Sequence, residues 1–138
     1  MKSRFLLFVK CYWKSVVWAG LILFASAISG NELDKVRIIH IPHFDKFVHL
    51  VLYFVFTLLL FAAQIKLNAT TQLKLSTKLI NIVFPFFYSL IMEILQRFVF
   101  ENRSFELADL LANSFGILLC WLLYSLEINF LKRIIRFL

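Results

Sequence analysis

The sequence has few of the residues that soluble, disordered or disulfide-stabilised proteins need. Its 138 residues include only two cysteines, three glycines and two prolines, and only 17% are charged. Two cysteines exclude a disulfide-rich scaffold. Hydrophobic residues make up 62% of the chain, against about 45–50% in an average soluble domain. This excess excludes a soluble globular domain and a disordered chain, and it leaves a small helical membrane protein with several spans.

Four apolar stretches of the chain are candidate transmembrane helices. A span needs about 20 residues, and the stretches cover about 12–29, 45–64, 79–100 and 106–126. No alternation of polar and apolar residues predicts strands. The sequence therefore predicts an all-α fold: a single domain, residues 1–138, in which four transmembrane helices form an antiparallel bundle, followed by an amphipathic basic tail over 127–138. A cleaved signal peptide is the alternative for the first stretch, but Lys10 and Lys14 favour a retained span.

Basic residues predict how the bundle is oriented. The side with both termini and the loop between the second and third spans carries ten of the fifteen Lys and Arg residues. By the positive-inside rule this side is cytoplasmic, so both termini lie inside and the protein belongs to the cytoplasmic membrane. The net charge of +7 then reflects topology. No basic stripe with stacking aromatics indicates a nucleic-acid partner.

Polar side chains interrupt the spans near the predicted outer face. They lie at the start of the second span, at the end of the third, in the short loop that follows and at the start of the fourth. Ionisable groups within spans are costly and usually face a bundle interior or a cavity. The candidate polar site comprises Asp45, Lys46, His49, Tyr53, Glu93, Gln96, Arg103, Glu106, Asp109, Asn113 and Gly116.

Each of these residues also has a structural interpretation. Carboxylates suit helix N-termini, polar side chains such as His49 and Asn113 hydrogen-bond between helices, and Gly116 permits a close helix approach. Glu93 fits this interpretation least well, because a buried carboxylate needs a cation or a proton. The loop between the third and fourth spans is short, so we expect Glu93, Arg103 and Asp109 to form one coupled unit.

Several of these motifs occur in an order that resembles a known family. They are Asp45-Lys46-Phe47-Val48-His49 with Tyr53, Glu93-Ile94-Leu95-Gln96, and Asn102-Arg103-Ser104-Phe105-Glu106 continuing through Asp109 to Gly116, preceded by Phe24 to Gly30. Together they resemble the VanZ-like family of bacterial membrane proteins over roughly residues 15–125. The family often has Asp where Glu106 stands and a second Gly where Cys120 stands. The resemblance implies a four-helix membrane protein and no settled reaction; the founding member is linked to low-level resistance to the glycopeptide teicoplanin.

Three functions remain open at this stage. The first is an envelope or antibiotic-resistance protein whose outward polar pocket binds a lipid headgroup, a lipid-linked cell-wall precursor or a glycopeptide, with Arg103 and Lys46 meeting anionic groups. The second is a structural subunit of a larger membrane complex. The third is an enzyme that uses His49, Glu93 and Asp109 as acids and bases. Small size favours the first two. No cofactor is indicated. A metal site is a minor fourth option: His49 with Asp45, Glu93 and Asp109 offers suitable ligand types, but no spacing of the HExxH type supports it.

Overall fold

The computed structural model describes residues 2–27, 44–100, 105–126, 133–135 and 138. Four long helices account for most of them: α1 (Lys2–Ala27), α3 (Phe44–Asn68), α4 (Leu75–Phe98) and α5 (Leu107–Ser125). Each is long and apolar enough to cross a membrane, and the described ranges contain no strand. The prediction of an all-α fold with four transmembrane helices is confirmed.

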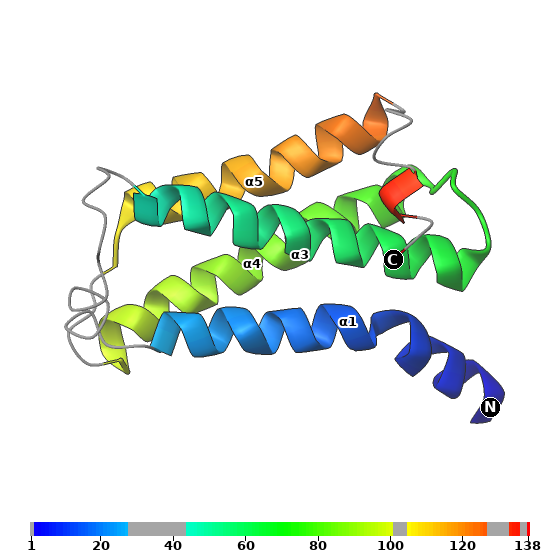
Figure 1. The fold of residues 1–138 in the computed structure, drawn as a ribbon, viewed down its shortest axis with the longest axis horizontal. Coiled ribbons are helices and arrows are strands. Elements are labelled where there is room, and N and C mark those ends of the chain that lie inside the picture. The colour runs from blue at the N-terminus through cyan, green and yellow to red at the C-terminus, as the bar shows by residue number, and fades with distance from the viewer. Residues whose placement is uncertain (1, 28–43, 101–104, 127–132, 136–137) are drawn as a thin grey trace.

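The helix α3 lies at the centre of the bundle. It packs against α1, α4 and α5, and Figure 1 shows the other three helices around it. Because it has neighbours on several sides, side chains are buried around its circumference, including Tyr53, Phe56 and the run from Leu58 to Ala63. Its sequence is correspondingly the most apolar of the four.

The helix α1 lies at the edge of the bundle and is attached by a few specific contacts. Trp18 Nε1 donates a hydrogen bond to the Leu52 carbonyl of α3 at 2.9 Å, and the Tyr88 hydroxyl of α4 donates one to the Ala19 carbonyl at 2.7 Å. Ile22 is buried between these helices. Most other large side chains of α1 are exposed, as expected for a helix that borders acyl chains.

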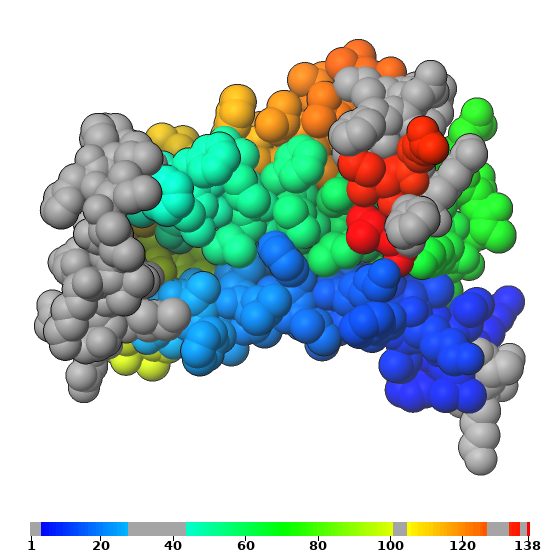
Figure 2. All heavy atoms as spheres, viewed as in Figure 1, coloured from blue at the N-terminus to red at the C-terminus, as the bar shows by residue number. Residues whose placement is uncertain are grey.

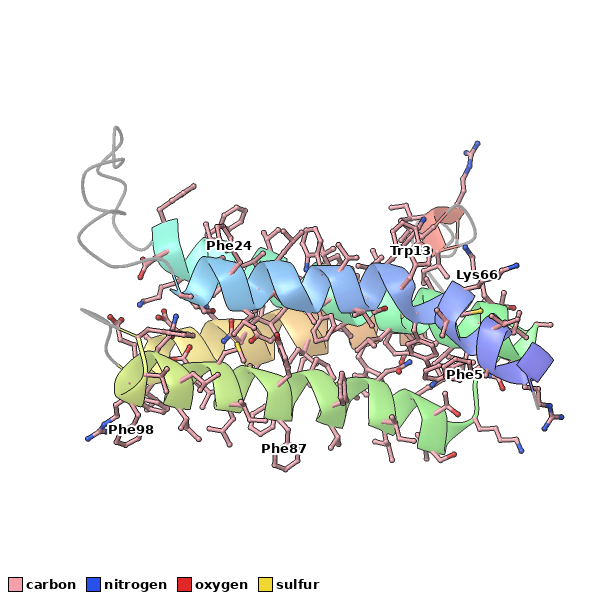
Figure 3. The ribbon with its side chains drawn as sticks, turned by 90° about the horizontal axis from the view of Figure 1, so that it is seen from below. Phe5, Trp13, Phe24, Lys66, Phe87 and Phe98 are labelled. Carbon is pink, nitrogen blue, oxygen red and sulfur yellow. The ribbon has the colours of Figure 1, made fainter. Side chains whose placement is uncertain are left out.

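Large apolar side chains cover the outside of the bundle. Phe24, Phe87 and Phe98 point away from it in Figure 3, and each is more than half exposed. A soluble protein rarely exposes so large an apolar surface, whereas a bilayer solvates it. The exposed side chains and the four long helices therefore agree on a multi-pass membrane protein.

The described ends of the chain lie at the same end of the bundle (Figure 1). Ile134, Ile135 and Leu138 pack against a cluster that includes Phe61 and Leu73, and Lys14 Nζ donates a hydrogen bond to an oxygen of Leu138. Figure 2 shows these tail residues, in red, against α3 and beside α1. The described tail residues, 133–135 and 138, therefore lie against the bundle, and residues 127–132 and 136–137 of the predicted basic tail lie outside the described residues. Whether it also lies on a membrane surface stays a prediction.

The opposite end of the bundle is where α3 and α5 begin and where α4 ends (Figure 1). We call it the polar end, because the predicted site residues of all three helices are there. The helices α3 and α5 run in the same direction, with α4 antiparallel to both, so residues from three distant parts of the sequence meet at one level.

Candidate functional site

A glycine brings α5 directly against α3. A Cβ atom built on Gly116 would lie 2.3 Å from the Leu50 carbonyl oxygen and 3.1 Å from the Phe54 nitrogen. No side chain fits there, so only glycine lets the two backbones approach this closely. Cys120, one turn further along α5, is completely buried. The close crossing holds the first turns of α3 and α5 side by side.

Lys46 is the cationic centre of the polar end. Its Nζ lies 2.8 Å from Asp45 Oδ2 and also forms ion pairs with Glu106 Oε2 and Asp109 Oδ1. The Lys46 side chain is 21% exposed and the Asp109 side chain 11%. Pairs this sheltered are screened less than surface pairs, so Lys46 and Asp109 tie α3 to α5 more strongly than an exposed salt bridge would.

His49 lies one turn further along α3 and joins the same group. Its Nδ1 is 3.1 Å from Asn113 Oδ1, and its Nε2 is 3.6 Å from Asp109 Oδ2. Asp109 therefore lies between Lys46 and His49 and faces both. Asn113 is 1% exposed, so its contact with His49 is shielded from water and lipid.

Glu93 brings α4 into the cluster. It is 1% exposed, and its Oε2 accepts a hydrogen bond from the Glu106 backbone nitrogen at 3.4 Å. Glu106 is the residue before α5, where backbone N–H groups lack helical partners. Carboxylate oxygens of Glu93 and Asp109 and a ring nitrogen of His49 lie within 4.8 Å of one another.

Tyr53 and Gln96 are two further buried polar residues, and each follows a member of this group by about one helical turn. Tyr53 is one turn beyond His49 on α3, and its hydroxyl has no hydrogen-bond partner in the part of the chain that the structure describes. Gln96 is one turn beyond Glu93 on α4 and is also buried. Both lie within the bundle at the polar end.

The structure brings most of the predicted site residues into one cluster, which we call the polar cluster. Gly116 has a packing role beside it, and Tyr53 and Gln96 are buried nearby. Arg103 lies outside the described residues, so the coupled unit of Glu93, Arg103 and Asp109 stays a prediction. The polar cluster consists of Asp45, Lys46, His49, Glu93, Glu106, Asp109 and Asn113.

The role of Lys46 differs from the sequence interpretation. We expected Lys46 to meet an anionic ligand, but three carboxylates already surround it. Alternate spans of a bundle run in the same direction, so the second and fourth spans both begin at this end. That signal in the sequence places Lys46 at the same level of the bundle as Glu106 and Asp109.

The comparisons with known proteins agree with this architecture. The VanZ/LLP1 family pattern matches residues 6–130. No curated protein and no solved structure matches the chain. The family match spans all four helices and the whole polar cluster, which lies between Asp45 and Asn113. The chain belongs to the VanZ/LLP1 family.

Proposed function

We propose that this protein acts in the cell envelope by engaging a polar headgroup at the polar cluster. In this proposal both termini are cytoplasmic, as the distribution of Lys and Arg predicts, and the polar end faces the outer leaflet of the cytoplasmic membrane. The observation that carries the proposal is the convergence of Lys46, His49, Glu93 and Asp109 at one level of three apolar helices. Ionisable groups at such positions are expensive and usually mark functional sites.

The charge of the polar cluster indicates which headgroup chemistry suits it. It contains one lysine and four carboxylates, and Lys46 is already paired. Carboxylates accept hydrogen bonds, so the cluster favours amine and hydroxyl donors over a bare anionic group. Aminophospholipids and lipid-linked sugars of cell-wall synthesis both carry such donors.

The test uses protein in lipid nanodiscs of phosphatidylethanolamine or phosphatidylglycerol, followed by native mass spectrometry. The protein should retain phosphatidylethanolamine in preference, because its ammonium group pairs with the cluster carboxylates. Asp109→Asn should remove the preference. The control, Lys66→Ala, alters the opposite end of α3 (Figure 3) and should keep it. Equal retention of both lipids, or an unchanged preference in Asp109→Asn, would contradict the proposal.

The family resemblance adds a role in resistance to lipophilic glycopeptides. Headgroup engagement near the outer leaflet would protect a lipid-linked precursor or exclude the drug. Expression in a sensitive bacterium should then raise the teicoplanin concentration that stops growth, and Asp109→Asn should abolish the rise at equal protein abundance. An identical growth limit with and without the protein would reject this role.

A further inference from the structure

We propose that His49, Glu93 and Asp109 form a binding site for one divalent transition-metal cation of the Zn²⁺ class. The three residues come from α3, α4 and α5, and each offers a ligand atom within 4.8 Å of the others. The proposal concerns residues of the polar cluster but does not depend on the headgroup chosen above.

The separations suit a metal that draws the ligands slightly together. His49 Nε2 and Asp109 Oδ2 are 3.6 Å apart. Two ligands bound at about 2.0–2.2 Å in a tetrahedral zinc site lie about 3.3–3.6 Å from each other. This pair is therefore already near its bound spacing, and a carboxylate oxygen of Glu93 lies within 4.8 Å of a ligand atom of each of the other two residues.

The second ring nitrogen of His49 is held as it is in known metal sites. Metal-binding histidines almost always donate their other ring N–H to a fixed acceptor, and here Nδ1 faces Asn113 Oδ1 at 3.1 Å. With the proton on Nδ1, the neutral ring has its lone pair on Nε2. The 3.6 Å separation from Asp109 is longer than a hydrogen bond, so Nε2 remains available.

Buried donors without partners provide a second, independent observation. Asn113 Nδ2 and the Tyr53 hydroxyl are both buried and lack hydrogen-bond partners among the described residues. Native proteins rarely leave such groups unpaired unless an ion, water or ligand completes the site. Three protein ligands leave zinc an open position for water or a substrate oxygen, which is the kind of acceptor that these donors lack.

Charge balance favours a cation between His49, Glu93 and Asp109, and not at the neighbouring group of three carboxylates. Asp45, Glu106 and Asp109 also lie close together, but Lys46 Nζ forms ion pairs with all three. Within the described ranges Glu93 has no ion-pair partner, and its carboxylate accepts a hydrogen bond from the Glu106 backbone N–H. A divalent cation would compensate Glu93 and the part of the Asp109 charge that Lys46, shared among three carboxylates, does not. The imidazole ligand favours Zn²⁺ over Mg²⁺ or Ca²⁺, which prefer oxygen.

The experiment measures Zn²⁺ binding by tag-free, EDTA-treated protein in detergent without added lipid. Calorimetry and elemental analysis should find one Zn²⁺ per chain, Mg²⁺ should not compete, and Zn²⁺ should raise the melting temperature. His49→Gln should remove the binding. Asn113→Leu should weaken it about 10–100-fold, as expected for a group that orients a ligand.

The matched control for Asn113→Leu is Asn81→Leu. Asn81 is also a buried amide whose Nδ2 lacks a described partner, but it lies toward the start of α4, away from the polar end. Its replacement should leave the Zn²⁺ affinity unchanged. Co²⁺ bound to the unmodified protein should give a visible spectrum without thiolate charge-transfer bands, so the ligand set is tested even where a variant does not fold.

Three results would overturn the proposal. They are the absence of Zn²⁺ uptake by the unmodified protein, wild-type affinity in His49→Gln, and thiolate bands that assign the metal to Cys11 or Cys120. Because no lipid is added, a failure to bind Zn²⁺ does not contradict the headgroup proposal. Equal retention of the two lipids in nanodiscs, in turn, does not contradict the metal site.

Discussion

At the scale of single residues, Lys46 has the greatest effect on the electrostatics of the polar cluster. It is the one cation among the described members of the cluster, and it pairs with three carboxylates from two helices. Removing one partner of a sheltered ion pair leaves the other charge uncompensated, which is more costly than the pair is stabilising. The fold and the site therefore both depend on this lysine.

Lys46→Met tests that dependence. The substitution keeps the aliphatic stem and removes the ammonium, so we expect it to lower the free energy of unfolding by about 1–3 kcal/mol, between the values for exposed and buried pairs. Denaturant unfolding in detergent measures the change. Lys66→Met at the opposite, exposed end of α3 is the control and should change stability little. Equal effects of the two variants would contradict the ion-pair assignment.

At the scale of helices, the α3–α5 crossing depends on Gly116. Gly116→Ala would place a Cβ atom 2.3 Å from the Leu50 carbonyl oxygen, so α5 must move away from α3. We expect a loss of about 1–3 kcal/mol, typical of overpacking, and a weakened contact between His49 and Asn113. Thermal unfolding of the purified protein checks the first expectation.

Gly20→Ala is a matched control for that change. A Cβ atom at Gly20 meets nothing within 4 Å, and alanine favours a helix over glycine by about 1 kcal/mol. This variant should be as stable as the natural protein or more so. A Gly116→Ala protein that is equally stable would show that the two backbones are not in contact.

Tyr88→Phe tests how α1 is attached. It removes the hydroxyl that donates to the Ala19 carbonyl and leaves the ring in place. We expect the free energy of unfolding to fall by about 0.5–1.5 kcal/mol, the usual net value of one hydrogen bond. The substitution should also speed amide hydrogen exchange more in α1 than in α5. Unchanged exchange in α1 would mean that the Tyr88 hydrogen bond does not hold this helix, and that the Trp18 hydrogen bond and apolar contacts do.

The sequence predicts helices best where apolar residues are continuous. The stretch 45–64 lies within α3, because few polar residues interrupt it. The helix α1 begins at Lys2, ten residues before the predicted span. Lys10 and Lys14 interrupt its apolar pattern, but long basic side chains extend toward an interface and do not end a helix.

The site was predictable as a set of residues but not as a set of contacts. Helical spacing placed His49 beside Asp45, and Asp109 beside Asn113, within their own helices. Which helix faces which is decided by tertiary packing at points such as Gly116. That packing pairs Lys46 with Glu106 and Asp109, a result that spacing within one helix does not contain.

At the scale of the whole molecule, the account makes a claim about orientation. By the positive-inside rule, we propose that the polar end faces the outside of the cell and that the end with the described tail faces the cytoplasm. Both claims rest on the distribution of Lys and Arg along the chain. Figure 1 shows the polar end, where α3 and α5 begin, at the opposite end of the bundle from the described ends of the chain.

Cysteine labelling in intact cells tests the orientation. In a background with Cys11 and Cys120 replaced by serine, Glu106→Cys should react with a membrane-impermeant maleimide added outside. Lys66→Cys should react only after the cells are permeabilised. The reverse pattern would invert the topology and move the polar cluster to the cytoplasmic leaflet.

The most direct test of the central claim is the stability of Glu93→Met. The claim is that Glu93, which the ion pairs of Lys46 do not include, is kept in the polar cluster for binding and not to hold the bundle together. Glu93 is 1% exposed and accepts a 3.4 Å hydrogen bond from the Glu106 backbone N–H. Replacement of a buried ionic group by an apolar one of similar volume is often neutral or stabilising. In metal-free protein, we predict that Glu93→Met unfolds with the same free energy as the natural protein or a higher one. A decrease of about 3–5 kcal/mol, the cost of breaking a buried structural pair, would contradict the claim.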